Sequence, residues 1–268
     1  MWIVAALALF IAATAGWYSI RPRGDREWIA EQAVMPSAVF DGDMVRVEDV
    51  RNFTYTSRTA FTAAYDTRTY DLRTLNSVWY VLTPFSMKWR GPAHSFVSFG
   101  FSDGRYLSIS VEARRQPGEV YDAVKGLFKR FELIYVIGDE RDLIGQRAAY
   151  GTDRVYLYPI RTSPEKMRQM LAGMLERANQ LRERPEFYNT LFNNCTSNVV
   201  AHVNQVTPRA VQAGIKVMLP GYTDEVAIRL GLIDTDLDLD RARERYLINE
   251  RARQSVRDPA FSSRIRGL

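Results

Sequence analysis

The sequence predicts a mixed α+β domain that follows an N-terminal membrane-spanning helix. The first observation is an apolar run without a charged residue at positions 2–20. The second is that, between about residue 44 and residue 206, stretches of alternating apolar residues are interspersed with stretches of helical periodicity. Hydrophobic residues make up 46% of the 268 positions and charged residues 25%, a composition that excludes a disordered chain. Strands and helices mixed in this way are typical of one α+β domain, here with a helical C-terminal extension.

The apolar run at the N-terminus has the length of a bilayer span. As a helix it extends over roughly 28 Å, close to the thickness of a bilayer core. Trp17 and Tyr18 at its end suit the interfacial belt. A cleaved signal peptide is the main alternative, but it has a basic segment in front and an apolar stretch of only about 7–15 residues. We therefore expect an uncleaved anchor at residues 1–20.

Proline and glycine residues divide the rest of the chain into three segments. We expect a linker at residues 21–40, a main domain that carries the predicted catalytic residues at 41–208, and a helical C-terminal extension at residues 209–268. Three arginines follow the span between positions 21 and 26. Taken literally, the positive-inside rule keeps the main domain in the cytoplasm.

Local patterns predict the order of the elements. Strands are expected at residues 44–56, 66–72, 94–101, 106–112, 133–137 and 155–160, and residues 74–83 fit either a helix or a strand. Helices are expected at residues 118–130, 139–150, from 163 onward, 195–206, 209–218, 223–231 and 240–256. The helix from Ser163 has a cap residue, a proline at its first position and an early acid.

The segments 94–101 and 106–112 predict a β-hairpin. A three-residue loop at positions 102–104, with glycine in the left-handed position, sorts aliphatic and aromatic residues onto one face and a serine-rich set onto the other. In that register His94 lies directly across from Glu112. A carboxylate beside an imidazole fixes its tautomer and supports its charged form. The serine-rich face suits a cleft floor, and the alternative is a pair on an exposed sheet face.

Cys195 is the only cysteine and lies in a polar segment at the predicted start of a helix. At that position the macrodipole and the free N–H groups favour a reactive thiolate and bind an oxyanion. The alternative is a buried structural cysteine, which prefers apolar neighbours. The residues of this segment that we expect to orient the thiol or an oxyanion are Asn193, Asn194, Thr196 and Tyr188.

Of the two histidines, His94 is the better partner for the cysteine. His202 lies seven residues after Cys195, roughly 10 Å along the helix and too far for proton abstraction at about 3 Å. Folding can bring His94 close from its distant strand. We therefore expect a Cys195–His94 dyad with Glu112 as the group that orients the imidazole.

The composition argues against several other classes of protein. One cysteine and two histidines exclude a Cys-rich metal site, and we expect no metal and no cofactor. Four aspartates alternate between positions 234 and 240, but the glycine and the final glutamate of a calcium-binding loop are missing, so helix capping is expected there. The net charge of +5 is spread among acidic residues, which argues against nucleic acid and favours an anionic membrane surface as the partner.

Three longer strings resemble a known bacterial family. They are AHSFVSFGF with DGRYLSISVEARR (93–115), GLFKRFELIYVIGDERDLI (126–144) and FYNTLFNNCTSN (187–198). Over about residues 45–210 the chain resembles the Lnb N-terminal periplasmic domain family, associated with thiol-dependent lipoprotein N-acyltransferases. The order of histidine strand before cysteine helix is also similar to that of lecithin retinol acyltransferase-type enzymes. The resemblance implies a circularly permuted papain-like fold, Cys195 as nucleophile, His94 as base and a periplasmic site.

The resemblance therefore implies a membrane-anchored thiol acyltransferase. Cys195 would take an acyl chain from a phospholipid or lipoprotein ester and pass it to an amine, such as a lipoprotein N-terminus. Two alternatives stay open: a cysteine amidase or peptidase acting on cell-envelope peptide, and a non-enzymatic membrane-tethered binding domain. A long apolar groove would favour lipid, and polar backbone docking would favour peptide. The resemblance implies that the main domain is periplasmic, whereas the arginines after the span favour a cytoplasmic domain.

Overall fold

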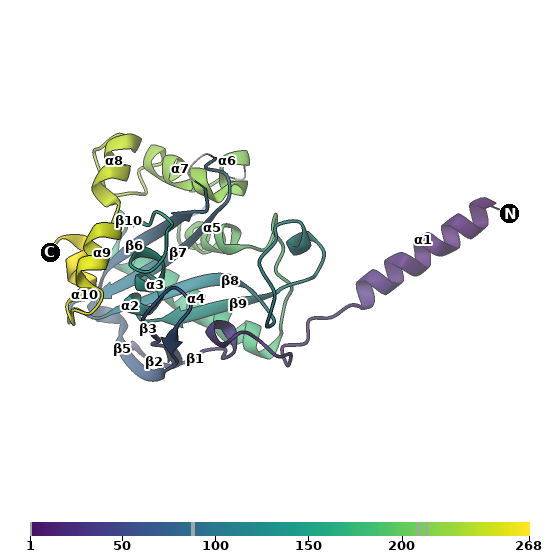
Figure 1. Cartoon of the computed structure of the whole chain (residues 1–268), viewed down its shortest axis with the longest axis horizontal. Helices are drawn as coiled ribbons and strands as arrows, with labels where there is room; N and C mark the ends of the chain where they lie inside the picture. The colour runs from purple at the N-terminus through teal and green to yellow at the C-terminus, as the bar shows by residue number, and fades with distance from the viewer. Residues whose placement is uncertain (1, 87–88, 208–209, 213) are drawn as a thin grey trace.

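A single mixed sheet with helices on both faces forms the body of the molecule (Figure 1). The computed structural model describes residues 2–86, 89–207, 210–212 and 214–268. The main sheet has the order β1-β2-β9-β8-β7-β6-β10, and β5 pairs with β2 off this path. Its strands are β1 (Ser37–Asp41), β2 (Met44–Arg51), β5 (Tyr65–Asp71), β6 (Leu75–Pro84), β7 (Ala93–Phe101), β8 (Tyr106–Arg114), β9 (Glu132–Gly138) and β10 (Tyr156–Pro159). A separate short pair consists of β3 (Thr54–Tyr55) and β4 (Phe61–Thr62).

The helices follow the mixed order that the sequence predicts. They are α1 (Trp2–Ser19), α2 (Glu140–Leu143), α3 (Gly145–Ala148), α4 (Pro164–Glu183), α5 (Cys195–Val206), α6 (Ile215–Met218), α7 (Thr223–Arg229), α8 (Leu239–Tyr246), α9 (Asn249–Ser255) and α10 (Phe261–Arg266). Short 3₁₀ turns occur at η1 (Ala30–Gln32), η2 (Leu72–Thr74), η3 (Lys125–Leu127) and η4 (Pro220–Tyr222). The α+β class is thus confirmed, as is the helical C-terminus.

The hairpin of β7 and β8 has the predicted register. Phe96 pairs with Ser110 and Gly100 pairs with Tyr106. The Phe101 N–H donates to the Arg105 carbonyl (3.0 Å), and Gly104 has φ of 83°, the left-handed conformation that the three-residue loop requires. Alternation along β7 therefore sends His94 and Phe96 to one side of the sheet, and Ser95 and Val97 to the other.

The two sides of the sheet carry different helices. On one side, which we call the α5 face, α4 and α5 pack on β6 to β9, and the apolar core includes Val97, Tyr135 and Cys195. On the opposite side, which we call the α9 face, α2, α3, α9 and α10 cover a second core around Phe96 and Ile134. The serine-rich face of the hairpin is the α9 face. Its serines are 0% exposed, so it is neither an exposed surface nor a cleft floor: Ser98, Ser108 and Ser110.

Helix α4 forms as its sequence pattern predicts. The Ser163 hydroxyl accepts a hydrogen bond from the Lys166 N–H (3.3 Å), and Pro164 occupies the first helical position. Its Met- and Leu-rich stripe is buried against the sheet. Each such side chain contributes about 1.5–3 kcal/mol when it is removed from water, which is what holds α4 on the α5 face.

Three predicted helices differ in the structure. Residues 118–130 form an irregular segment with only the 3₁₀ turn η3. Gly118 and Lys129 have positive φ there, and Gly126 packs against the Thr190 side chain, so tertiary contacts prevail over the apolar spacing. Residues 240–256 are split into α8 and α9 at Leu247, which has an extended backbone. The predicted helix at 209–218 is reduced to α6, and positions 209 and 213 lie outside the described residues.

The anchor leaves the body at one end. Among the described ranges, α1 is the one helix long and apolar enough to cross a membrane, and it is unburied by the protein (Figure 1). The linker is partly structured, because its last residues form the edge strand β1. The Arg23 and Gly24 N–H groups both donate to the Glu132 carboxylate (2.8 and 3.0 Å), which ties the exit of the anchor to the start of β9.

Candidate functional site

The start of α5 is built by a reciprocal cap. The Ser197 N–H donates to Asn194 Oδ1 (2.9 Å), and the Asn194 N–H donates to Ser197 Oγ (2.8 Å). Asn194 is therefore the cap residue of α5. Within the described part of the chain, the N–H groups of Cys195 and Thr196 have no acceptor, so they are the donors that remain available to an oxyanion.

Asn193 supports the loop rather than the thiol. Its amide donates to the Phe187 carbonyl (3.0 Å), and its Oδ1 accepts from Asn198 Nδ2 (2.9 Å). Asn198 Nδ2 also donates to the Asn194 carbonyl (2.9 Å). These bonds fix residues 187–194 against the first turn of α5, which positions Cys195 at the start of the helix.

Cys195 lies in a row of hydroxyl groups on the α5 face. The residue is 5% exposed, and its Sγ lies 3.8 Å from Thr196 Oγ1. Thr196 Oγ1 in turn lies 3.2 Å from Ser95 Oγ on β7. The Tyr80 hydroxyl follows, hydrogen-bonded to Ser95 and 2.5 Å from Thr223 Oγ1. The thiol thus lies in the apolar core and contacts a neutral hydroxyl rather than an imidazole or a carboxylate.

Two tyrosines beside the thiol stay protonated. Burial raises the pKa of Tyr80 and of Tyr188, and the nearby sulfur of Cys195, when charged, raises both pKa values further. The Tyr188 hydroxyl lies 3.3 Å from the Tyr121 hydroxyl. Tyr188 is therefore close to Cys195, as the sequence predicts, and can act there only as a neutral hydrogen-bonding group.

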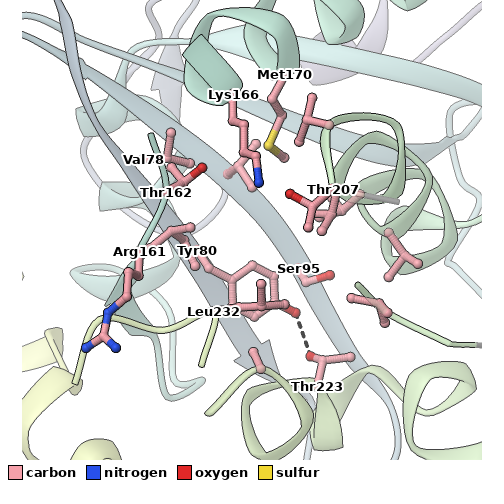
Figure 2. A pocket seen from close by; sticks show the side chains of 18 of the residues that line it. Val78, Tyr80, Ser95, Arg161, Thr162, Lys166, Met170, Thr207, Thr223 and Leu232 are labelled. Atoms are coloured by element: carbon pink, nitrogen blue, oxygen red, sulfur yellow. Dashed lines mark hydrogen bonds between the residues drawn. The ribbon is translucent and has the colours of Figure 1, made fainter. Parts of the chain in front are cut away.

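An apolar pocket extends along α5 from the neighbourhood of the thiol. It has a volume of about 240 Å³ and is bounded by β6, β7, α4, α5 and α7 (Figure 2). The α5 side chains that line it recur at helical spacing: Thr196, Val199, Val200, Val203, Val206 and Thr207. The pocket thus begins at the residue next to Cys195 and follows the whole length of the helix.

The polar groups of the pocket are few and lie at defined places. Ser95, Tyr80 and Thr223 contribute hydroxyls near the Cys195 end (Figure 2). Lys166 points into the pocket from α4 and is half-buried (Figure 2). The other cation in the lining, Arg161, is paired with Asp234 at 2.9 Å. Such a lining, mostly aliphatic with a few hydroxyls and a cation, suits a hydrocarbon chain with a polar group attached.

His94 lies on the opposite side of the sheet in a charged network. His94 Nε2 lies 2.8 Å from Ser110 Oγ, which donates to Glu112 Oε1 (2.8 Å). The predicted contact of His94 with Glu112 is present at 3.8 Å between Nε2 and Oε1. The Glu112 carboxylate also accepts from Arg147 Nη2 (3.0 Å) and from Gln32 Nε2 (2.7 Å).

The charge state of His94 differs from the expectation. Burial, followed by the positive charge of Arg147, lowers the pKa of His94 to about 3, although Glu112 acts in the opposite direction. Burial alone would raise the pKa of Glu112, but the charges of Arg147 and of groups around it hold that pKa at about 2. The Glu112 carboxylate is therefore paired mainly with Arg147, and His94 is neutral near pH 7.

The structure brings His94 together with Glu112, but it does not bring either of them to Cys195. Ser95, the residue after His94, is the one that faces α5 and contacts Thr196. Because consecutive strand residues point to opposite sides, His94 faces Phe96 and Ser110 on the α9 face. The direct dyad expected from chain order is corrected by this geometry. Strand β7 does pack against α5, but the alternation of side chains along the strand means that Ser95 faces the helix and His94 does not.

His202 is occupied by other partners, as its distance along α5 predicts. Its Nε2 lies 3.0 Å from the Tyr135 hydroxyl, and its Nδ1 lies 3.2 Å from Gln205 Oε1. Burial lowers its pKa to about 4. His202 is therefore a neutral core residue between α5 and β9.

Sequence reasoning missed the hydroxyl row and Arg147. Ser95 and Tyr80 carry no spacing signal, because serine and tyrosine are ordinary residues in strands. The alternation that placed His94 on one face did, however, put Ser95 on the other, so β7 offered a signal for this residue. Arg147 lies on α3, and nothing local in the sequence pairs it with Glu112.

The acidic residues at 234–240 act as caps and ion-pair partners. The Asp238 side chain accepts the Arg241 N–H at the start of α8 (3.0 Å), and Asp234 pairs with Arg161. Over the ranges that the structure describes, no group of three or more histidine, cysteine or acidic side chains is arranged to hold a metal ion.

These observations define an α+β domain that follows an apolar helix long enough to cross a membrane, with a lone cysteine at a helix start beside an apolar pocket. A family model described as the Lnb N-terminal periplasmic domain matches residues 61–226, more than half of the chain. The chain therefore belongs to the Lnb N-terminal periplasmic domain family. Neither the curated proteins nor the solved structures contain a significant match.

The family and α1 together fit a membrane-anchored protein with a periplasmic domain. The arginines after the span favour the other orientation, but they are partly neutralised by local contacts. Arg23 pairs with Asp25 (3.4 Å), and Arg26 lies 3.6 Å from the Glu132 carboxylate. Three arginines are a modest bias in the positive-inside rule, and the family fits the periplasmic orientation.

Proposed function

We propose that this domain is a thiol acyltransferase that takes an acyl chain from a membrane phospholipid or lipoprotein ester and transfers it to an amine. The observation that carries the proposal is the apolar pocket along α5, which begins at Thr196, next to Cys195. A peptide substrate would need backbone donors and acceptors along a cleft, whereas this lining is largely aliphatic. The geometry thus favours acyl transfer over the amidase or peptidase alternative.

The reaction balances with the groups of this chain and its substrates alone. The sulfur of Cys195 forms a bond to the acyl carbon, the ester C–O bond breaks, and the thiol proton leaves with the departing alcohol. An incoming amine then breaks the thioester, forms the amide and returns a proton to the sulfur. The N–H groups of Cys195 and Thr196 are the available donors for the oxyanion in both steps.

The proposed role of His94 requires a movement. As a general base, its imidazole must come to about 3 Å from the sulfur, whereas in this structure it is bonded to Ser110 on the α9 face. A rotation of the start of β7 would exchange His94 and Ser95, and Glu112 could orient the ring only if β8 turned with it, because Glu112 lies on the α9 face. We keep the circularly permuted papain-like arrangement as part of this proposal, on the order of the histidine strand before the cysteine helix.

A second candidate function is a membrane-tethered domain that binds lipid without chemistry. The separation of His94 and Cys195 by the sheet is the specific observation that favours it. Both candidates use the same pocket, and they differ in whether the bound acyl chain becomes covalently attached to Cys195.

Mass spectrometry of the full chain incubated with phospholipid vesicles separates the two. We expect an acyl adduct on the peptide that contains Cys195, lost on treatment with neutral hydroxylamine and absent from the Cys195→Ala variant. Binding of a fluorescent fatty acid should be the same in both proteins, because alanine leaves the pocket lining unchanged. Equal binding with no adduct on the parent protein would reject the acyltransferase and favour the non-enzymatic domain.

A further inference from the structure

We infer that the segments 118–130 and 189–193 form a surface that inserts into the bilayer beside the anchor and holds the start of α5 at the membrane. Five large apolar side chains of these segments, which we call the insertion surface, are exposed. They are Val120 (77%), Val124 (64%), Phe128 (61%), Leu191 (38%) and Phe192 (78%). Exposed apolar residues concentrated in two adjacent loops mark an interaction site.

Contacts with the anchor identify a bilayer as the partner. The ring of Phe128 packs edge-on against Trp17, with 6.3 Å between the ring centroids. Lys129 Nζ donates to the carbonyls of Trp17 (2.7 Å) and Ile20 (3.3 Å). Trp17 and Tyr18 are residues of the type that lies at the membrane–water interface. Since Phe128 is in contact with Trp17, it lies at the same level.

The attachment of the anchor is too extensive to act as a free tether. The backbone just after α1 donates twice to Glu132, and Arg26 approaches the same carboxylate. Glu132 begins β9 and is 1% exposed, so it belongs to the rigid body of the sheet. The side of the body from which α1 leaves, where both loops lie (Figure 1), is thereby held against the membrane.

The two loops are hydrogen-bonded to each other. The Thr190 hydroxyl donates to the Ala123 carbonyl (2.7 Å), and the Thr190 N–H donates to the Gly126 carbonyl (3.3 Å). A side chain at Gly126 would collide with the Thr190 hydroxyl at 2.3 Å, so glycine is required for this contact. Phe192 and Phe128 are therefore presented from a joined platform, and Phe192 lies only three residues before Cys195.

The charges of the platform agree with a lipid surface. Residues 118–130 contain three basic and two acidic residues, and one of the acidic residues, Glu119, is paired with Arg130. Lys125 is exposed beside Val124. Lysine and arginine next to apolar side chains suit the headgroup region of an anionic bilayer, where the stems are buried and the charges stay in water.

A depth measurement on the full chain tests the insertion surface directly. Single cysteines are placed by Phe192→Cys or Val124→Cys in a Cys195→Ser background, labelled with an environment-sensitive fluorophore, and reconstituted in phosphatidylethanolamine–phosphatidylglycerol vesicles. Leu268→Cys is the matched control, because Leu268 is also apolar and exposed (79%) and lies at the end of the body away from α1 (Figure 1). We expect lipid-borne spin labels to quench positions 192 and 124 but not position 268. Iodide quenching of all three labels to the same extent would overturn the inference.

The consequence for Cys195 rests on the proposed function and is tested separately. In a Val124→Asp, Phe192→Asp double variant, we expect adduct formation from vesicle lipid to fall about tenfold or more, because charged side chains resist insertion. Adduct formation from a short water-soluble thioester should be unchanged. If lipid quenches the labels while the parent protein forms no adduct, acyl transfer is rejected and the insertion surface stands. Equal adduct yields from vesicle lipid for both proteins would reject its role in delivering lipid.

Discussion

The two faces of the central sheet place neighbouring residues of β7 in different surroundings. On the α9 face, His94 enters a network in which Ser110, Glu112 and Arg147 are bonded to one another. On the α5 face, Ser95 enters a row of neutral hydroxyls beside a pocket that is open to a ligand. On the α9 face the charges are paired with one another, whereas the α5 face combines the N–H groups at the start of a helix with empty volume.

This difference teaches which face is suited to bind. Charges on the α9 face are fully paired and are further protected by the C-terminal helices. Arg266 of α10 donates twice to Glu140, at 2.8 and 2.5 Å, and both side chains are 0% exposed. Ser98 donates to the same carboxylate (2.5 Å). A network of this kind pairs buried charges of the sheet with those of the C-terminal extension, so we assign it to stability.

The largest effect is expected on the α9 face from Arg266→Ala. This change leaves Glu140 buried without its cation, which costs about 3–5 kcal/mol of unfolding free energy. Urea unfolding of the full chain in detergent measures the loss. The control is Arg264→Ala, because that side chain is 64% exposed and its ion pair contributes about 1 kcal/mol or less. Similar losses for the two variants would contradict the assignment of the α9 face to stability.

A change on the α5 face should affect ligand binding more than folding. We expect Val200→Trp to fill the pocket and to weaken fatty-acid binding by about tenfold or more, because the indole ring would occupy the volume that the acyl chain needs. Ala201→Trp places the same side chain on an exposed position of α5 outside the pocket lining. Fluorescence titration should show little change for that control. Unchanged binding by Val200→Trp would mean that the ligand lies elsewhere.

Acid should weaken the protein through its buried histidines. The pKa of His94 is lowered from 6.5 to about 3 and that of His202 to about 4. Between those values and 6.5 the unfolded chain binds protons that the folded protein does not, so stability falls as the pH falls through this window. The slope is about 1.4 kcal/mol per pH unit for each histidine.

Urea midpoints at pH 5.0, 6.0 and 7.0 measure this slope. His94→Gln removes one of the two titrating groups, so we expect the pH dependence of its unfolding free energy to be about half that of the parent protein. A slope that is unchanged by His94→Gln would show that His94 is already charged in the folded protein, and the closed network of the α9 face would then be wrong.

The smallest effect is expected where the two faces meet. The movement proposed for His94 accompanies acyl transfer, so in the ligand-free protein the sheet should still separate His94 from Cys195. In that state, His94→Gln should change the rate of Cys195 alkylation by iodoacetamide at pH 7 by less than about threefold, whereas a working base contributes about 10²–10⁴-fold. The measurement uses the folded full chain, with Cys195→Ser as the unreactive control. A decrease of a hundredfold would break the comparison and show that His94 reaches the sulfur in another conformation.

Local patterns were sufficient for much of the architecture. The cap and proline of α4, the exact span of α5 at residues 195–206 and the register of β7 with β8 all follow from short-range rules. Period-two alternation also determined the pairing of His94 with Glu112, because register and face are properties of the hairpin alone. The segment 118–130 failed as a helix because its conformation is set by Thr190 and the anchor, which are distant in the sequence.

The sequence by itself therefore determined the apolar N-terminal helix, the α+β class, the hairpin register and the position of Cys195 at the start of a helix. Each of these depends on residues that are near one another in the chain. Only the tertiary structure decided which side of the sheet α5 covers, and hence that Ser95 rather than His94 meets the first turn of α5. It also decided that Arg147 pairs with Glu112 and that the pocket lies along the valines of α5. These outcomes depend on how helices from distant parts of the chain pack on the sheet. That packing brings Arg147 and Glu112 together on the α9 face and leaves the apolar pocket unfilled on the α5 face.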